Sequence, residues 1–499
     1  MKIIIGIFSI KNVIVIMFIC ISQSSKISSQ SIMNSHKHFP MKRYSLILLV
    51  LLFCQFVGAQ QLAPFRRGDR VAFVGNSITD GGHYHSYIWL YYMTHYPNMR
   101  LWMDNCGVGG DTSGQILARL DDDVLSRRPT VLTFTFGMND TGYQEHNGDE
   151  AQAFADRKVA EARTNFLACE QRLKEQTQVR KIMLGTSPYD QNSTFNNEVF
   201  KNKNNAMQRL VAIQDSAARA NHWEFFDFNA PIVRLNSEQQ AIDPTFTLCG
   251  TDRIHPDNDG HAAMAYLFLQ AQGMVGQKVA DVELDATTGR LLKAGNCRIS
   301  HIRRADGDLQ FDYQAKSLPY PLDTVPHGWG FTRPAALVER VIPSFVDDLS
   351  DEHLCVKGLS GTYQLTIDKV IIDTLQASQL AAGINLARYR HTPQYQQACV
   401  VMTLNECRWD LERRLREWAW VNYTFLLPEG HMNDYTEAGA ECYRRLCLDN
   451  AWLASRRGSY DMYFHPELQQ ATRDEISFLV DRIYSLNKPQ KRHVALKRL

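Results

Sequence analysis

This chain has little net charge, no closely spaced cysteine pair and no clustered metal ligands. The net charge of the 499 residues is +1 and both signs are interspersed, so no basic surface is indicated and we expect no nucleic-acid partner. None of the 11 cysteines forms a Cys-x-x-Cys pair, which excludes a common zinc-site spacing. His83 and His85 lack a third ligand nearby. We therefore expect no metal and no cofactor.

The longest apolar runs lie at the N-terminus, over residues 3–21 and 46–57. The second run follows a basic stretch and precedes Gly58-Ala59, which is the order of a signal peptide, and it is too short to span a membrane comfortably. We expect residues 1–40 to be an over-long gene start and residues 41–59 to be a signal peptide cleaved near Ala59. The mature protein is then periplasmic or extracellular, without stable membrane insertion. A genuine long leader or a two-span anchor is the alternative.

Residues 69–276 alternate short apolar runs with helical patterns, and we assign residues 60–278 to one domain. Such alternation predicts an α/β fold in which helices cover both faces of a parallel sheet. Ligands of such sheets bind at the carboxyl ends of the strands. The expected strands are Val71–Val74, Leu101–Met103, Val131–Phe136, Lys181–Leu184 and Trp223–Phe228, and the expected helices are Ser86–His95, Gln115–Leu125, Ala151–Glu175 and Asn202–Asn221.

The pattern changes beyond Gly276. Residues 279–390 carry β-rich runs separated by turn signals, and residues 391–499 carry helical spacing with dense charge. Thr392 and Pro393 supply an N-cap residue and a proline at the first helical position. We therefore expect a β-rich segment followed by a helical tail. Its expected helices are 394–415, 437–454 and 466–486.

Four short blocks in the first domain supply the parts of an acyl-transfer site. Ser77 follows an apolar strand and precedes a turn, which places its hydroxyl at the carboxyl edge of the sheet as a candidate nucleophile. Taken alone, this block more often marks a serine that serves only as a helix cap. The joint occurrence of the blocks predicts a serine esterase. They are Gly75–Asp80, Asn105–Thr112, Gly137–Asp140 and Asp252–Pro256.

A serine nucleophile needs a base, and the base needs a carboxylate that orients it. Asp252 and His255 are three residues apart, so both side chains can lie on one side of a turn. Pro256 disfavours helical geometry at His255. This spacing predicts that Asp252 holds one imidazole nitrogen while the other faces Ser77. The alternative is an ordinary surface Asp and His beside a helix start.

Gly110 and Asn139 are the candidate donors to an oxyanion. Glycine allows a backbone N–H to approach closely and to adopt a positive φ. The Asn139 amide is a neutral donor that follows the predicted strand ending at Phe136. Donors fixed in advance at a developing oxyanion contribute strongly to acyl transfer. As alternatives, the glycines form only a tight turn and Asn139 only a helix cap.

Together, the four blocks resemble those of the SGNH, or GDSL-type, hydrolase superfamily, over roughly residues 69–276. The resemblance implies a three-layer sandwich around a parallel five-stranded sheet. It also implies that Ser77 is the nucleophile, His255 the general base and then acid, and Asp252 the residue that orients His255.

The resemblance further implies an oxyanion hole made of the Ser77 amide, the Gly110 amide and the Asn139 side chain. Gly110 is preferred over Gly109 because the family glycine precedes the Asp-Thr pair that begins the next helix. The sequence departs from the family at Asn76, where an acid is usual. That acid supports the loop rather than transferring protons, so we expect activity to persist.

The loops after the strands are rich in polar and aromatic groups, which bind sugars, whereas long acyl chains need an apolar channel. We expect removal of small acyl groups, acetyl above all, from an acylated carbohydrate. The alternatives are a lipase or lysophospholipase of the same superfamily and a catalytically dead carbohydrate-binding protein. The sequence leaves the sugar, the ester position and the oligomeric state open. The residues expected to contact substrate are His83, Tyr84, His85, Tyr189 and Asp190.

Overall fold

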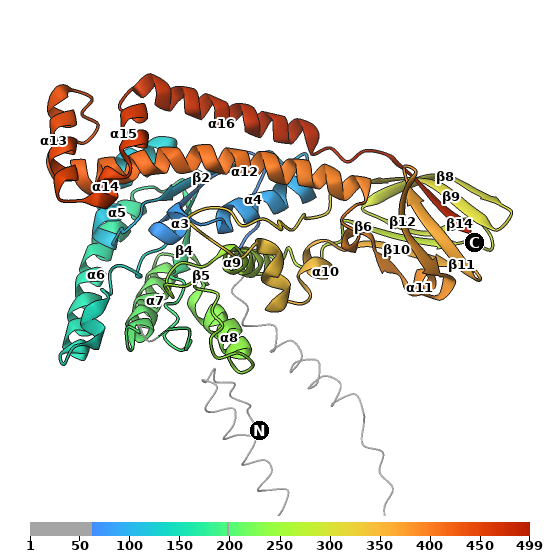
Figure 1. Cartoon of the computed structure of the whole chain (residues 1–499), viewed down its shortest axis with the longest axis horizontal. Coiled ribbons are helices and arrows are strands. Elements are labelled where there is room, and N and C mark those ends of the chain that lie inside the picture. The colour runs from blue at the N-terminus through green and yellow to red at the C-terminus, as the bar shows by residue number, and fades with distance from the viewer. Residues whose placement is uncertain (1–61, 197–198) are drawn as a thin grey trace, which may run out of the picture. The chain divides into compact units, whose positions relative to one another are not determined.

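A parallel five-stranded sheet with the order β2-β1-β3-β4-β5 forms the centre of the first domain (Figure 1). The computed structural model describes residues 62–196 and 199–499, so the predicted leader over residues 1–59 lies outside the described residues. The parallel pairing confirms the predicted α/β class. The strands are β1 (Arg70–Gly75), β2 (Trp102–Gly107), β3 (Val131–Phe134), β4 (Arg180–Gly185) and β5 (Glu224–Asp227).

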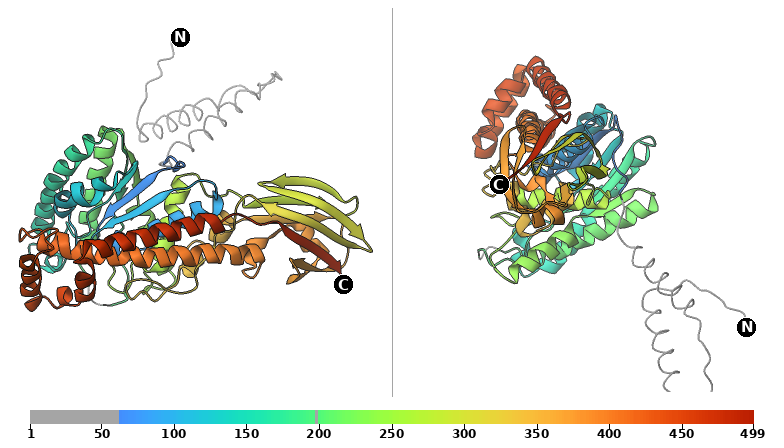
Figure 2. Two further views of the ribbon diagram at one scale, coloured as in Figure 1. Left: turned by 90° about the horizontal axis from the view of Figure 1, so that it is seen from above. Right: turned by 90° about the vertical axis from the view of Figure 1, so that its right-hand side faces the viewer.

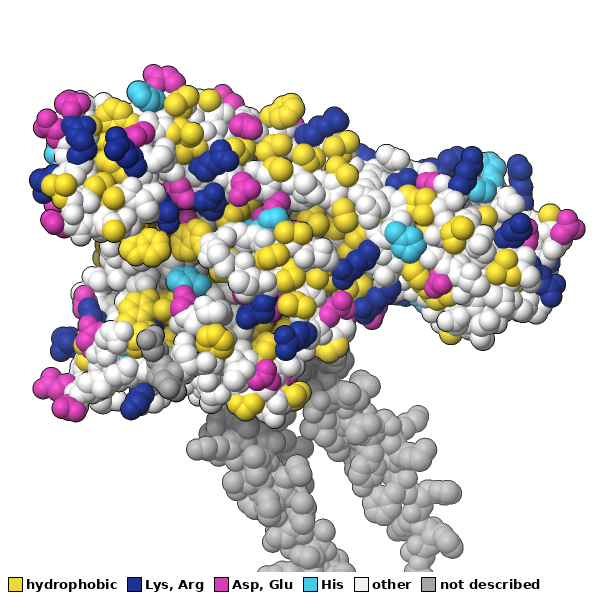
Figure 3. Space-filling model, in the orientation of Figure 1, with side chains coloured by type: hydrophobic (Ala, Val, Ile, Leu, Met, Phe, Trp, Pro, Cys, Tyr) yellow, Lys and Arg dark blue, Asp and Glu magenta, His cyan; other side chains and the backbone are white. Residues whose placement is uncertain are grey.

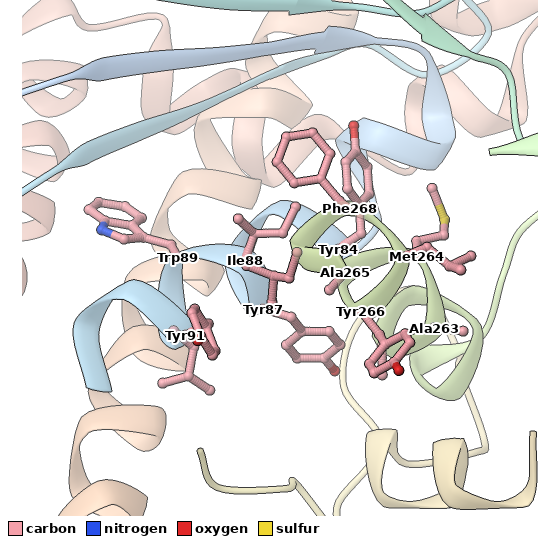
Figure 4. Packing of buried hydrophobic residues seen from close by; sticks show 14 of the residues in the cluster. Tyr84, Tyr87, Ile88, Trp89, Tyr91, Ala263, Met264, Ala265, Tyr266 and Phe268 are labelled. Carbon is pink, nitrogen blue, oxygen red and sulfur yellow. The ribbon is translucent and has the colours of Figure 1, made fainter. Parts of the chain in front are cut away.

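Alternate residues of β1 face two helical layers. Val71 and Phe73 pack in one buried cluster, whereas Ala72 and Val74 pack in another on the opposite face of the sheet. Figure 4 shows side chains of α4 lying against those of α9 in the first cluster. The first layer contains α4 (Tyr84–His95), α8 (Asn229–Gln240) and α9 (Asn258–Ala271), and the second contains α5 (Ser113–Arg119), α6 (Ala151–Lys174) and α7 (Lys203–Ala220).

α8 is not among the predicted helices, because Pro231 interrupts a short and mostly polar stretch. The other predicted helices of this domain are present within a few residues of the expected bounds. The region after α5 differs in detail: α5 ends at Arg119, and the chain continues as a wider π-helical turn, η1 (Leu120–Val124).

Two further sheets share a separate apolar core. One has the order β13-β10-β6-β7 and the other the order β12-β11-β14-β9-β8. Leu284 and Leu354 of the first sheet pack in one cluster with Phe311 and Leu365 of the second. The strands are β6 (Ala280–Asp285), β7 (Arg290–Gly295), β8 (Cys297–Ala305), β9 (Asp308–Ala315), β10 (Glu352–Lys357), β11 (Thr362–Ile367), β12 (Val370–Gln376), β13 (Ile384–Asn385) and β14 (Arg492–Arg498).

The last strand departs from the helical tail predicted over residues 391–499. β14 pairs with both β9 and β11, and places Val494 opposite Phe311 and Leu496 opposite Leu365. Only two of its residues are buried, and basic residues surround them. So short an apolar pattern is weak on its own, and the pairing partners far away in the sequence determine the strand.

The helical tail begins as predicted. The Thr392 hydroxyl accepts a hydrogen bond from the Tyr395 amide at 3.4 Å, and Pro393 is the first residue of α12. α12 and α16 lie side by side, as Figure 1 and the left view of Figure 2 show. The helices are α12 (Pro393–Trp420), α13 (Glu437–Leu448), α14 (Ala451–Ala454), α15 (Arg457–Tyr463) and α16 (Pro466–Leu486).

The packing crosses the predicted boundary at residue 278, which falls in the turn between α9 and β6. Leu318, Phe345 and Val401 all belong to the buried cluster that contains Phe73 of the central sheet. α12 also contacts α4 and β2 directly. The C-terminal half therefore completes the core of the first domain. The short elements in it are η4 (Ala335–Arg340), α10 (Phe345–Leu349) and α11 (Ala377–Ala382).

Basic and acidic side chains are mixed over the face shown in Figure 3. Throughout residues 62–196 and 199–499, we find no helix that combines the length and the apolar character needed to cross a membrane. The nine cysteines in these ranges are all free thiols.

Candidate active site

Ser77 lies at the carboxyl end of β1, between the neighbouring strands β2 and β3. It is the first residue of α3 (Ser77–Asp80), and Asn76 caps this turn because its Oδ1 accepts a hydrogen bond from the Ile78 amide at 3.1 Å. The amide oxygen of Asn76 thus serves as a cap where an acid was the expected residue. Ser77 is 8% exposed, so its hydroxyl is largely shielded from water.

Ser77, His255 and Asp252 form a continuous chain of hydrogen bonds. Ser77 Oγ lies 2.8 Å from His255 Nε2, and His255 Nδ1 lies 2.5 Å from Asp252 Oδ2. The other carboxylate oxygen, Oδ1, accepts hydrogen bonds from the amides of Ile254 at 2.8 Å and His255 at 2.9 Å. Both oxygens of Asp252 are therefore bound, which fixes the carboxylate against the imidazole.

The protonation states follow from these contacts. Burial raises the pKa of Asp252, but the hydrogen bond and charge of His255 and the two backbone amides outweigh burial and hold this pKa below its usual range. An ionised carboxylate only accepts hydrogen bonds, so Nδ1 carries a proton, and in the neutral imidazole Nε2 then accepts from the Ser77 hydroxyl. This is the tautomer that a general base requires.

Arg253 fixes the loop that carries Asp252 and His255. Its φ is +65°, a left-handed conformation that costs a non-glycine residue roughly 1–3 kcal/mol. Its buried guanidinium donates to the carbonyls of Ser193 and Asn196, both at 2.5 Å. These charge-assisted hydrogen bonds offset the backbone strain and hold the loop in place.

The loop after β2 presents Gly110 at the same edge of the sheet. Gly110 has a φ of +84°, and a side chain there would meet nothing within 4 Å, so backbone conformation rather than crowding favours glycine. Gly109 ties the loop to α3, because its amide donates to Asp80 Oδ2 at 3.0 Å. Burial raises the pKa of Asp80 to about 7, and Arg416 and the Gly109 amide oppose this rise. Among the described residues, the Gly110 amide donates to no backbone carbonyl.

Two hydrogen bonds orient the Asn139 side chain. Its Nδ2 donates to the Asp111 carbonyl at 2.9 Å, and its Oδ1 accepts from the Tyr143 hydroxyl at 2.5 Å. The oxygen therefore points to Tyr143, and one N–H of the amide is left for another acceptor. The ammonium of Lys203 lies 4.1 Å from the centre of the Tyr143 ring and donates to the Met138 carbonyl at 2.6 Å. Burial lowers the pKa of Lys203 to about 7.

A buried ion network connects α12 to the loop that carries Gly110. Arg119 donates to Asp111 at 2.7 Å and to Asp123 at 2.5 Å. Arg416 of α12 donates to both oxygens of Asp123 at 2.7 Å and to the Gly107 carbonyl at 2.9 Å. Burial raises the pKa of Asp123, but Arg416 and its neighbouring guanidinium groups outweigh burial and keep it well below the usual range.

The prediction that His83, Tyr84 and His85 contact substrate is wrong. All three are at most 2% exposed, because α4 begins in this stretch and is covered by α9 and α12. The Tyr84 hydroxyl bonds to Thr79 Oγ1 at 3.0 Å. His85 Nε2 bonds to the Thr79 carbonyl at 3.1 Å, and His83 Nε2 bonds to Glu406 of α12 at 2.5 Å. These side chains support α3 and bind α12.

Tyr189 and Asp190 are also buried, at 1% and 4% exposure, which corrects their predicted substrate contact. The Tyr189 hydroxyl accepts from the Phe200 amide at 3.1 Å. The Asp190 carboxylate accepts from the Ser193 amide at 3.1 Å and from Gln240 at 2.8 Å. Both residues therefore shape the loop after β4, against which Arg253 is held.

Several residues around the site were not predicted for the roles that the structure gives them. Tyr143 follows Asn139 by four positions, a spacing that suits a side-chain contact across a turn, so this pair was open to prediction. Apart from the position of Arg253 between Asp252 and His255, nothing in the sequence indicates that it holds their loop in place. Trp329 comes from a distant loop, and no local pattern links it to the site.

The chain is similar to several known proteins. The sequence profile of the GDSL-like lipase/acylhydrolase family matches residues 73–263, and that of the diltiazem deacetylase C-terminal helical domain matches residues 399–488. The solved structure of a gut microbial diltiazem-metabolizing enzyme is 47% identical, with a TM-score of 0.87, and covers 89% of this chain and 100% of its own. An acetylxylan esterase from Geobacillus stearothermophilus is 24% identical over 227 residues, which span 41% of this chain and 94% of the esterase.

The chain therefore belongs to the SGNH/GDSL-type hydrolase superfamily, as the whole-length relative and the first profile show. Its catalytic activity is that of a carboxylic ester hydrolase.

Proposed function

We propose that this enzyme removes small acyl groups, acetyl above all, from carbohydrate, with Ser77 as the nucleophile. The observation that carries the proposal is the unbroken chain of hydrogen bonds from Ser77 through His255 to Asp252. Two names among the relatives support an acetyl group: an acetylxylan esterase and the diltiazem deacetylase C-terminal helical domain. The first of these also supports a carbohydrate as the alcohol.

In the proposed reaction, His255 Nε2 accepts the Ser77 proton while Oγ attacks the ester carbonyl carbon. The carbonyl oxygen becomes an oxyanion that receives hydrogen bonds from the Ser77 and Gly110 amides and from Asn139 Nδ2. His255 then gives its proton to the leaving alcohol as the carbon–oxygen bond breaks, and the acyl group remains on Ser77. Water, deprotonated by His255, releases the acid and restores the serine, while Asp252 stays ionised throughout.

A second candidate is an acetyl ester of a ring-bearing alcohol that is not a sugar. The diltiazem-metabolizing relative favours it, because the likeness to that enzyme covers almost the whole chain. Acetate release from acetylated xylo-oligosaccharide and from diltiazem, measured side by side at equal enzyme concentration, separates the two candidates. A higher kcat/KM on the oligosaccharide supports our proposal, and a higher value on diltiazem supports the second candidate.

The acyl-chain profile is expected to peak at acetate. The Asn139 side chain and the Tyr143 hydroxyl that donates to it are polar, whereas a long acyl chain needs an apolar channel. With 4-nitrophenyl esters from acetate to decanoate, we expect kcat/KM to fall at least about tenfold by octanoate, since a misfit in a binding pocket costs roughly 1–3 kcal/mol. A maximum at long chains, or activation at a lipid interface, would instead identify a lipase.

Activity is expected to fall on the acid side because a general base must be unprotonated to accept the Ser77 proton. The lowered pKa of Asp252 keeps its carboxylate ionised, so it adds no second loss over the same range. The carboxyl of Asp80, which binds the Gly109 amide beside the site, has a pKa of about 7. The pH profile of kcat/KM should therefore be compared between the wild type and Asp80→Asn, which retains an acceptor for Gly109. We expect kcat/KM to fall at acid pH in both enzymes. If the fall is absent from Asp80→Asn, then Asp80 rather than the catalytic base causes it.

A further inference from the structure

The loop over residues 323–334 is fastened to the start of α9, directly after the catalytic histidine. The Asn258 side chain makes two hydrogen bonds with the backbone of His327, at 2.7 Å and 3.0 Å. The Asp257 carboxylate accepts from the amides of Thr332 and Arg333, both at 3.1 Å. Contacts on both sides of the loop tip thus hold residues 328–331 in one place.

The tip of this loop carries Trp329, whose indole lies beside the catalytic groups. The centres of the Trp329 and His255 rings are 6.1 Å apart with an edge-on arrangement. A side chain at Gly81 would come within 2.4 Å of the Trp329 ring, so the indole rests on the backbone just after α3. Trp329 is nevertheless 39% exposed, which leaves part of its ring open to a ligand.

The chemistry at His255 indicates which part of the substrate lies near this ring. His255 gives its proton to the leaving alcohol, so the alcohol oxygen must lie within hydrogen-bond reach of Nε2 when the ester bond breaks. The acyl oxygen faces the opposite group of donors, Gly110 and Asn139. A ring held beside His255 therefore meets the alcohol part of the ester rather than its acyl part.

We propose that Trp329 is a specificity-determining residue that binds the ring of the leaving alcohol, and so selects acetates of ring-bearing alcohols over those of small alkyl alcohols. An indole offers a large, rigid apolar face at low entropic cost, which suits the apolar face of a pyranose or an aryl ring. The proposal rests on the proposed function, since it assigns the alcohol side of the same site. Residues 323–334 lie outside both matched family profiles, so this contact is a property of the connecting loop.

The test compares substrates that share the acetyl group and differ in the alcohol. We would measure kcat/KM for ethyl acetate, phenyl acetate and a monoacetylated methyl xyloside with the wild type, Trp329→Ala, Trp329→Leu and Trp329→Phe. Trp452→Ala is the matched control, because Trp452 is a 73% exposed tryptophan on α14. All variants are compared by their thermal unfolding midpoints.

We expect Trp329→Ala and Trp329→Leu to lower kcat/KM on at least one ring acetate by about fivefold to tenfold, mainly through KM, and to change ethyl acetate by less than about twofold. Trp329→Phe is expected to restore part of the loss. The ring acetate whose kcat/KM falls most shows whether the preferred ring is a sugar or an aryl group. Hydrolysis of the acetyl-enzyme, seen as the steady rate after a burst, should not change, because the alcohol has already left.

An equal loss on all three substrates, or no loss on either ring acetate, would overturn the proposal and leave Trp329 as a structural residue of the loop. Failure of the proposed function looks different: the wild type would then hydrolyse none of the acetates, or Ser77→Ala would hydrolyse them as fast as the wild type.

Discussion

Ser77→Ala is expected to reduce ester hydrolysis by roughly 10⁴- to 10⁶-fold, because the variant has no nucleophile to form the acyl-enzyme and retains only binding and oxyanion stabilisation. The site lies on a capped turn whose other hydrogen bonds do not involve the Ser77 hydroxyl, so the fold should persist. The measurement is kcat/KM on 4-nitrophenyl acetate, together with the thermal unfolding midpoint.

The matched control is Ser237→Ala, which removes an exposed serine on α8 whose hydroxyl donates only to the Val233 carbonyl. It should retain wild-type activity. If Ser77→Ala keeps more than about one hundredth of the wild-type kcat/KM while folded, Ser77 is not the nucleophile, because the smallest loss expected for a nucleophile is far larger.

Asn139→Ala is expected to lower kcat by roughly a hundred- to a thousand-fold while KM changes little. The amide N–H that remains after the bond to the Asp111 carbonyl is needed mainly when negative charge develops on the substrate oxygen. Steady-state kinetics on 4-nitrophenyl acetate separate the two parameters.

Labelling of folded Asn139→Ala by a fluorophosphonate is the control for this variant. It shows whether Ser77 and His255 remain assembled. An unchanged kcat would remove Asn139 from the oxyanion hole. A raised KM with unchanged kcat would instead assign Asn139 to binding of the ground state.

The predictions that the structure supports rest on local patterns. Apolar strands that alternate with helical stretches fix a parallel sheet, and residues that follow its strands meet at one edge. Asp252 and His255 contact each other because three positions on one turn bring them together. Patterns of this kind depend only on residues close together in the chain, so they can be read from the sequence.

The errors concern contacts between distant segments. His83 to His85 follow the nucleophile closely in sequence, which suggested a place in the cleft. The burial of His83 depends on Glu406 and Trp409 of α12, more than 300 residues away, and no pattern near His83 indicates this partner. The position of Trp329 depends in the same way on Asp257 and Asn258, which hold its loop.

The C-terminal half also acts on the site through buried charge. Arg416 binds Asp123 and the Gly107 carbonyl, and so fixes the start of the loop that presents Gly110. Removal of one member of such a buried ion pair typically costs roughly 3–5 kcal/mol, because the partner charge stays buried. α12 is therefore part of the structure that supports the site.

Peptide mapping after reaction with a fluorophosphonate tests the central claim most directly. The folded wild-type enzyme is labelled, digested and analysed by mass spectrometry, with Ser77→Ala treated in parallel. The account predicts one phosphonyl adduct, located on Ser77, with loss of activity in proportion to labelling and no adduct in the variant. An adduct on another serine, or full inhibition without modification of Ser77, would contradict it.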